Sequence, residues 1–157
     1  MKAISLRQPW LHAVLHYGKM LENRPWNTNL RGEFLLHAAL GMEDEEYAVA
    51  EDFIANALGW TGDAQRVAFR TDFKARDQRG GIVGRARLVD VLPPCNATAN
   101  SGQISIFNKP CTHTWHIPEQ YAFVLQDVQT TRFVSLKGLP GFFSVPDEIV
   151  AEALRAA

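Results

Sequence analysis

The sequence predicts an α+β fold in which a small mixed β-barrel is flanked by helices. Three observations predict it: several short strand-like runs, an amphipathic helix near the start of the chain, and another helix after the second strand. The chain has 157 residues, of which 46% are hydrophobic, and this suffices for one core. We therefore expect residues 1–157 to form a single domain.

The first elements follow from apolar spacing and turn residues. Lys2–Leu6 is expected to be a strand. A helix is predicted over Pro9–Tyr17, because proline suits a first helical turn and Gly18 suits the position just after a helix. Gly32–Ala39 contains a short apolar run bounded by turn residues, which is typical of a buried strand.

The middle of the chain contains the clearest helix and the clearest strand. Apolar residues between Tyr47 and Leu58 recur at helical spacing, acidic residues precede them, and Gly59 ends the pattern. Gly81–Leu92 is rich in Ile, Val and Leu and ends at a proline pair, as expected of a strand. The helix needs a sheet or barrel against which to pack.

The second half is predicted to contain a long loop and a hairpin. Cys95–Pro118 is polar and contains Gly, Pro and Asn, so we expect a loop with a short strand at Ile104–Phe107. Tyr121–Val128 and Arg132–Leu136 are expected to be two strands joined by a turn at Gln129–Thr131.

The last elements are short. Phe142-Phe143 is expected to add a short edge to the sheet, and Pro146–Ala156 is expected to be a terminal helix. No glycine-rich phosphate loop follows a predicted strand, which excludes dinucleotide-binding and P-loop proteins.

Composition indicates a soluble, cytoplasmic protein without a membrane partner. The longest apolar runs are shorter than the roughly 18–20 residues that span a bilayer, and the N-terminus lacks the pattern of a signal peptide. Cys95 and Cys111 are therefore predicted to be free thiols, because a reducing cytosol opposes a disulfide. Together with His113 and His116 they have the chemistry of zinc ligands, but their spacing matches no standard finger, so no metal or cofactor is predicted.

Charge is segregated along the chain although the net charge is only −1. Basic residues dominate residues 1–32 and 66–87, and acidic residues dominate residues 43–63. If the two basic segments share a face, an anionic ligand meets a local positive field there. The alternative is that the acidic helix and the basic segments neutralise each other.

Several motifs resemble those of one known family. Ser5–Trp10, Gly18–Trp26, Arg31-Gly32 and Leu36–Ala39 together resemble the ASCH domain family, a branch of the PUA-like β-barrel superfamily. The resemblance is strongest over the first forty residues and extends to later positions over nearly the whole chain. It implies a PUA-like barrel that recognises RNA or a modified nucleotide.

The resemblance leaves enzyme activity open. Similar proteins have been assigned ribonuclease activity, or amidohydrolase activity on acetylated cytidine through a Lys, a Thr three residues later and a distant Glu. Lys19 matches that Lys, but Glu22 occupies the Thr position. A carboxylate does not easily replace a hydroxyl nucleophile activated by a base.

Lys19, Glu22 and Arg24 are the principal candidate ligand-binding residues. In an extended segment Glu22 and Arg24 share one face, and Lys19 reaches toward them from the preceding turn. A carboxylate between two cations stays ionised and orients the guanidinium, whose donors suit a phosphate or the edge of a base. The alternative is a structural salt bridge between helix end and strand.

Further candidates lie around this segment. Arg7 and Gln8 precede the first helix and are placed to contact a ligand, while the neighbouring Trp10 is expected in the core. Trp26 and Trp115 each either stack on an unpaired base or pack against the barrel.

Two other classes of function remain open. In a hydrolase, Glu22 would be the general base, Lys19 would stabilise negative charge and His37 would donate a proton, although a hydrogen-bonded core histidine is the commoner reason for His37. In a protein-interaction module, the acidic helix around Glu43–Asp52 would bind a protein partner. The sequence predicts neither the natural RNA or nucleoside nor the oligomeric state.

Overall fold

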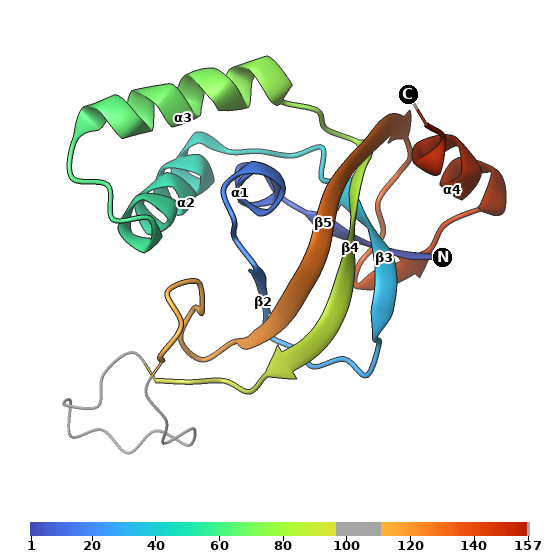
Figure 1. Ribbon diagram of the computed structural model, residues 1–157, viewed down its shortest axis with the longest axis horizontal. Helices are drawn as coiled ribbons and strands as arrows, with labels where there is room; N and C mark the ends of the chain where they lie inside the picture. The colour runs from blue at the N-terminus through green and yellow to red at the C-terminus, as the bar shows by residue number, and fades with distance from the viewer. Residues whose placement is uncertain (97–110, 157) are drawn as a thin grey trace.

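The structure is a computed structural model that describes residues 1–96 and 111–156. These residues form a curled mixed sheet, shaped as a half-barrel, with helices packed around it (Figure 1). Its strands are β1 (Lys2–Leu6), β2 (Leu21–Arg24), β3 (Gly32–Ala38), β4 (Gly81–Leu92), β5 (Tyr121–Ser135) and β6 (Phe142–Ser144). The helices of the described residues are α1 (Trp10–His16), α2 (Asp44–Ala57), α3 (Asp63–Arg76) and α4 (Asp147–Leu154).

The strands follow the order β2-β5-β4-β3-β1-β6 across the sheet. β1 runs parallel to β3, and the other neighbouring pairs are antiparallel. Side chains alternate between the two faces, so that Ile4 and Leu36 enter the core inside the curl while Ala3 and Leu35 face α4.

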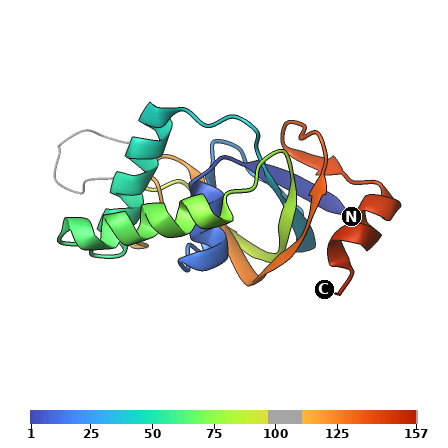
Figure 2. The same cartoon turned by 90° about the horizontal axis from the view of Figure 1, so that it is seen from above.

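The helices lie at two ends of the molecule. α1 packs between the sheet and the pair α2–α3, because Leu11 and Val14 join the core inside the curl while Ala13 joins a cluster with Ile54 and Phe69 (Figures 1 and 2). α4 lies at the other end, beside both termini (Figures 1 and 2). Within the described residues, every helix is too short or too polar to cross a membrane.

Most predicted elements are confirmed, and so is the α+β class. The strands predicted at 2–6, 32–39 and 81–92 correspond to β1, β3 and β4. The helices predicted near 9–17, 47–58 and 146–156 correspond to α1, α2 and α4, and the expected edge at 142–143 is β6. The strand expected at 104–107 lies outside the described residues.

The predicted hairpin at Gln129–Thr131 is wrong. Residues 121–135 form one long strand, β5, which pairs along its length with β4. Thr130 lies opposite Gly84, where a Cβ would be only 2.9 Å from the Gln129 carbonyl oxygen, so glycine allows the two backbones to approach. The polar residues that resemble a turn therefore continue the strand, and register shifts accommodate its bends.

The helix α3 was not predicted, because most of its residues belong to the segment 66–87, which was interpreted by its basic charge and not by its apolar spacing. Its buried apolar positions are Phe69 and Phe73, one helical turn apart, and the remaining positions are largely exposed. A stripe this narrow suffices because α3 covers only one side of α1 and α2. The Phe pair, with Asp63 in the first turn and Arg76 in the last, was the available signal.

The prediction of free thiols is also wrong. Cys95 and Cys111 form a disulfide, with 2.00 Å between the sulfur atoms. The bond joins the end of the β4 segment to the segment that leads into β5, where Cys111 N also donates to the Asn96 carbonyl oxygen at 2.9 Å. No group of three or more metal-ligand side chains gathers anywhere in residues 1–96 and 111–156.

Candidate functional site

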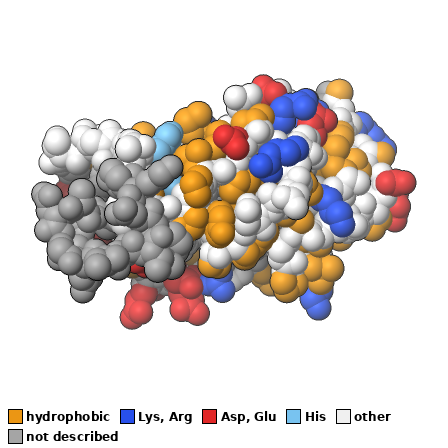
Figure 3. All heavy atoms as spheres, turned by 90° about the horizontal axis from the view of Figure 1, so that it is seen from below, with side chains coloured by type: hydrophobic (Ala, Val, Ile, Leu, Met, Phe, Trp, Pro, Cys, Tyr) orange, Lys and Arg blue, Asp and Glu red, His pale blue; other side chains and the backbone are white. Residues whose placement is uncertain are grey.

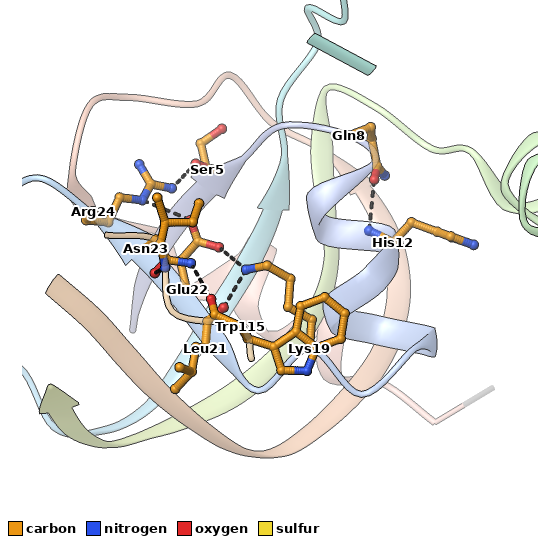
Figure 4. Close-up of polar contacts among 10 residues, drawn as sticks. Ser5, Gln8, His12, Lys19, Leu21, Glu22, Asn23, Arg24 and Trp115 are labelled. Carbon is orange, nitrogen blue, oxygen red and sulfur yellow. Dashed lines mark hydrogen bonds and ion pairs between the residues drawn. The ribbon is translucent and has the colours of Figure 1, made fainter. Parts of the chain in front are cut away.

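A buried ion cluster lies where β2 follows α1. Lys19 Nζ donates to Glu22 Oε2 at 3.5 Å, and Arg24 Nε donates to Glu22 Oε1 at 3.2 Å (Figure 4). Lys19 Nζ also donates to the Leu21 carbonyl oxygen, and Arg24 Nη2 donates to the Ser5 carbonyl oxygen at 2.7 Å. One carboxylate thus lies between two cations, and Arg24 connects β2 to β1.

The local sequence explains why these side chains meet. Gly18, with φ of +70°, follows the end of α1 and lets the chain turn back, so that Lys19 N bonds to a carbonyl of the helix. Glu22 and Arg24 lie two residues apart on β2 and share a face. β1 and β2 are not neighbours in the sheet order, so the curl of the sheet is what brings Arg24 to β1.

Lys19 is the most deeply buried charged group of the cluster. Its side chain is 1% exposed, and Nζ lies 5.5 Å from the centroid of the Trp10 ring. Burial lowers the pKa of Lys19, and the neighbouring Glu22 carboxylate only partly opposes this effect. A buried lysine with a lowered pKa beside a carboxylate is a frequent feature of functional sites.

A cavity of about 460 Å³ opens beside the cluster, and we call it the first cavity. Its lining includes Lys19, Glu22 and Arg24 together with Ser5, Arg7 and Trp10. Cations, a carboxylate, a hydroxyl and an aromatic ring therefore face one hollow. Small-molecule sites combine apolar surface with a few such convergent polar groups.

One wall of the first cavity is the segment that precedes β5. Ile117 and Gln120 of this segment line the cavity. Asn23 holds it in place, since Asn23 Nδ2 donates to the Trp115 carbonyl oxygen at 2.9 Å and Ile117 N donates to Asn23 Oδ1 at 2.8 Å (Figure 4). The amide on β2 thereby couples the ion cluster to this wall.

Arg7 and Gln8 are placed differently from each other. Arg7 lines the first cavity, and its guanidinium pairs with the Glu46 carboxylate of α2. Gln8 does not line this cavity, because its side chain is used inside the protein. Oε1 accepts from His12 N at 3.0 Å (Figure 4), and Nε2 donates to the Gln78 carbonyl oxygen at 3.4 Å.

The two candidate stacking tryptophans lie outside the first cavity. Trp26 packs edge-on against Phe123 and Phe142, with ring centroids 5.3 and 5.9 Å away. Trp115 is buried and its ring lies 6.2 Å from that of Phe53. The aromatic ring that borders the cavity is Trp10, which the sequence placed in the core.

His37 lines a different cavity, which adjoins the first. Its Nε2 donates to the Leu136 carbonyl oxygen at 2.6 Å, and its Nδ1 lies 2.8 Å from Ser5 Oγ. A carbonyl can only accept, so in the neutral ring Nδ1 is the acceptor and Ser5 is the donor. His37 therefore reaches the first cavity only through Ser5.

Ser5, Asn23 and Gln120 line the first cavity but were not among the candidates. Asn23 stands in the sequence between the candidates Glu22 and Arg24, so these neighbours could have indicated it. Ser5 is a polar residue between the buried Ile4 and Leu6, which was a weaker one. Nothing local marks Gln120, because its position depends on the preceding loop.

The segregated charges largely neutralise each other, as the second interpretation proposed. Arg66 and Arg70 of α3 pair with acidic residues of α2, and Arg76, Arg79 and Arg87 pair with other carboxylates. On the described part of the face in Figure 3, Lys and Arg side chains stand apart, with neutral, hydrophobic and acidic ones between them.

No protein-family model matches the chain, and no curated protein matches it in sequence.

Proposed function

We propose that this protein binds RNA, or a modified nucleotide, with a nucleobase in the first cavity. The observation that carries the proposal is the ion cluster of Lys19, Glu22 and Arg24, which is buried on one side and open to the cavity on the other. A carboxylate accepts hydrogen bonds from amino and imino groups of a base, and a guanidinium donates to its oxygens and ring nitrogens.

The resemblance to the ASCH family supports the same proposal. Two of the motifs that carry it, Ser5–Trp10 and Gly18–Trp26, contribute Ser5, Arg7, Trp10 and the whole ion cluster to the lining of the first cavity. We propose on this basis that the half-barrel is a PUA-like domain. The curl that brings Arg24 to β1 is the feature on which such a barrel would depend.

Fluorescence titration tests the proposed function, because Trp10 borders the cavity. The titrants are cytidine, uridine, adenosine, guanosine, N4-acetylcytidine and a labelled six-nucleotide single-stranded RNA. We expect saturable quenching with at least one nucleoside. Glu22→Gln keeps the shape of the side chain but removes its charge, and it should weaken binding by about tenfold or more, since hydrogen bonds to charged groups are strong.

Glu33→Gln is the matched control. Glu33 is an exposed carboxylate on β3 with a long, 3.8 Å contact to Arg87, and it does not line the first cavity. Both variants are first compared with the wild type in thermal unfolding, to separate a binding defect from a folding defect. Equal affinity of the two variants, or no binding of any titrant at millimolar concentration, would reject the proposal.

A second candidate is a hydrolase that uses the same cavity. The observation in its favour is the buried lysine of lowered pKa beside the carboxylate, since Glu22 as general base and Lys19 as a stabiliser of negative charge need this proximity. His37, the expected proton donor, contacts the first cavity only through Ser5.

Incubation with N4-acetylcytidine and with labelled single-stranded RNA tests this candidate. Deacetylation or strand cleavage that disappears in Glu22→Gln and persists in Glu33→Gln would support a hydrolase. Unaltered substrates at high enzyme concentration would eliminate it and leave the binding function as proposed.

A further inference from the structure

We infer that the cavity adjoining the first one binds the phosphate of the same ligand, so that the ligand is a nucleotide or an oligonucleotide rather than a free nucleoside. This inference rests on the proposed function of the first cavity. The second cavity, which His37 lines, has a volume of about 740 Å³ and shares the lining residues Ser5 and Ala39 with the first, so the two cavities are neighbours. The inference is that one ligand spans both cavities across these two residues.

The charge of the second cavity favours an anion. Arg79 and Lys137 line it, and its lining among the described residues contains no Asp or Glu. Lys137 is exposed and forms no hydrogen bond or ion pair with any described residue. Arg79 pairs through Nε with Asp77 at 3.2 Å, which neutralises part of its charge. Lys137 is thus the cation most available to a phosphate.

The junction between the cavities favours a sugar. In the neutral His37 ring, Ser5 Oγ donates a hydrogen bond to Nδ1, because Nε2 donates to the Leu136 carbonyl oxygen. Toward the cavities Ser5 Oγ can then only accept a hydrogen bond, and a ribose hydroxyl is a suitable donor. A nucleotide also has this order of groups, with the sugar between base and phosphate.

The turn that carries Lys137 fits tightly onto this junction. A Cβ at Gly138 would lie 2.7 Å from His37 Cε1 and 3.1 Å from Ser5 Oγ. Glycine therefore allows the turn to approach the Ser5–His37 pair, which fixes the backbone next to Lys137. The phosphate-binding cation is thereby held close to the junction.

The rest of the lining is compatible with a nucleotide chain. Leu40 and Leu139 are exposed apolar side chains that border the second cavity, and Ser135 adds a hydroxyl. Apolar surface suits a sugar face or the next base of a strand, and such contacts tolerate sequence variation.

The test compares each nucleoside of the panel with its 5′- and 3′-monophosphates, in wild type and in Lys137→Ala. We expect at least one monophosphate to bind about tenfold more tightly than its nucleoside, the effect of a charge-assisted contact. Lys137→Ala should remove this gain and leave nucleoside affinity unchanged. For the six-nucleotide RNA, the variant should also lower the log–log salt slope by about 0.7, as expected for one lost phosphate contact.

Lys74→Ala is the matched control. Lys74 is an exposed lysine of α3 that does not line either cavity, so its removal changes the net charge equally. If nucleosides bind but no monophosphate binds more tightly, or if the Lys137 and Lys74 variants behave alike, the second cavity is not the phosphate site and the proposed function of the first cavity stands. If no nucleoside, nucleotide or RNA binds, the proposed function fails and the inference with it.

Discussion

Glu22 and Glu51 are both buried carboxylates held between two basic side chains, but their surroundings differ. Arg70 donates two hydrogen bonds to Glu51, of 2.8 Å from Nε and 2.6 Å from Nη2, and Arg66 donates a third at 3.4 Å. Glu22 has longer contacts, 3.5 Å to Lys19 and 3.2 Å to Arg24, and a cavity beside it. One carboxylate joins two helices, and the other borders a cavity.

The pKa shifts of Glu51 and Lys19 also distinguish the two clusters. Burial alone would raise the pKa of Glu51, but hydrogen bonds and charges from Arg70 and Arg66 lower it, so the fold favours the charged form of this group. Burial lowers the pKa of Lys19 despite Glu22, so the fold opposes the charged form of that group. The surroundings of Glu51 therefore stabilise its charged form, whereas burial destabilises the charged form of Lys19.

A large loss of stability is expected when Glu51 loses both of its cationic partners. In Arg66→Ala/Arg70→Ala the carboxylate, 3% exposed in the wild type, has lost both cations. A buried Glu51 without a cation costs about 3 kcal/mol, at the lower end of the range for a broken buried pair, because the shortened side chains admit water and Tyr47 still contacts the carboxylate. Urea denaturation measures the loss, and nucleoside affinity should not change.

A compensating variant identifies the cause of this loss. Glu51→Met in the same background replaces the unpaired carboxylate by an apolar side chain of similar length and should restore most of the stability. If it restores none, packing of the arginine stems rather than charge holds α2 against α3.

The Cys95–Cys111 disulfide differs from the Glu51 cluster, because it holds the segment that forms one wall of the first cavity and does not join helices. Cys95→Ala/Cys111→Ala opens a loop with a sequence separation of 16 and should lower the free energy of unfolding by about 3 kcal/mol. Nucleoside affinity should also fall, since Ile117 and Gln120 follow Cys111. Denaturation and titration with and without a reductant measure both effects. Unchanged affinity after reduction would show that the hydrogen bonds of this segment, including those of Asn23, hold the wall without the disulfide.

His12 makes the helical layer sensitive to acid. Burial, with smaller contributions from His16 and Arg76, lowers its pKa from 6.5 to about 4, although Asp72 accepts from its Nε2 at 3.1 Å and opposes the shift. Between pH 6.5 and 4 the unfolded chain binds a proton that folded His12 does not, so stability falls as the pH falls through this window. The loss reaches about 3 kcal/mol at pH 4 and vanishes at pH 7.

Titration of the His12 ring protons by NMR checks the origin of this effect, and urea denaturation at pH 7 and 4.5 checks its size. His12→Phe should flatten the dependence of stability on pH. A His12 pKa near 6.5, or an unchanged slope in the variant, would assign the acid sensitivity to other groups.

The sequence was sufficient for those parts of the fold that depend on local pattern. Strand β4 was predicted with its observed bounds, because its apolar run and the prolines after it are local signals. The hairpin prediction failed at Gln129–Thr131, since the partner strand β4 decides there that the chain stays extended. Helix α3 was missed because only Phe69 and Phe73 are buried on it, and a helix that covers one side of others needs no wider stripe.

Some residues of the candidate site could likewise be predicted from local sequence, and others depend on the whole fold. Lys19, Glu22 and Arg24 lie within six residues, so strand periodicity for Glu22 and Arg24, with Lys19 in the turn before the strand, predicted that they meet. The placements of Trp26 and His37 depend on which side of the curled sheet each side chain faces, and no local signal indicated this. Ser5 joins the site because the sheet curls, a property of the whole fold.

The smallest change in stability is expected for Lys19→Met, although this residue is as deeply buried as any charged group of the described chain. Methionine has a similar length and removes a charge that the fold disfavours. In this variant Glu22 still pairs with Arg24, and its side chain is 11% exposed, so it is not left without a cation as Glu51 is in Arg66→Ala/Arg70→Ala. We expect the free energy of unfolding to change by less than about 1 kcal/mol, while nucleoside affinity falls at least tenfold because the cavity loses a donor. Urea denaturation and fluorescence titration of the same sample measure the two effects. A loss of stability as large as that of the Arg66/Arg70 variant, with affinity retained, would make Lys19 a structural residue like those around Glu51.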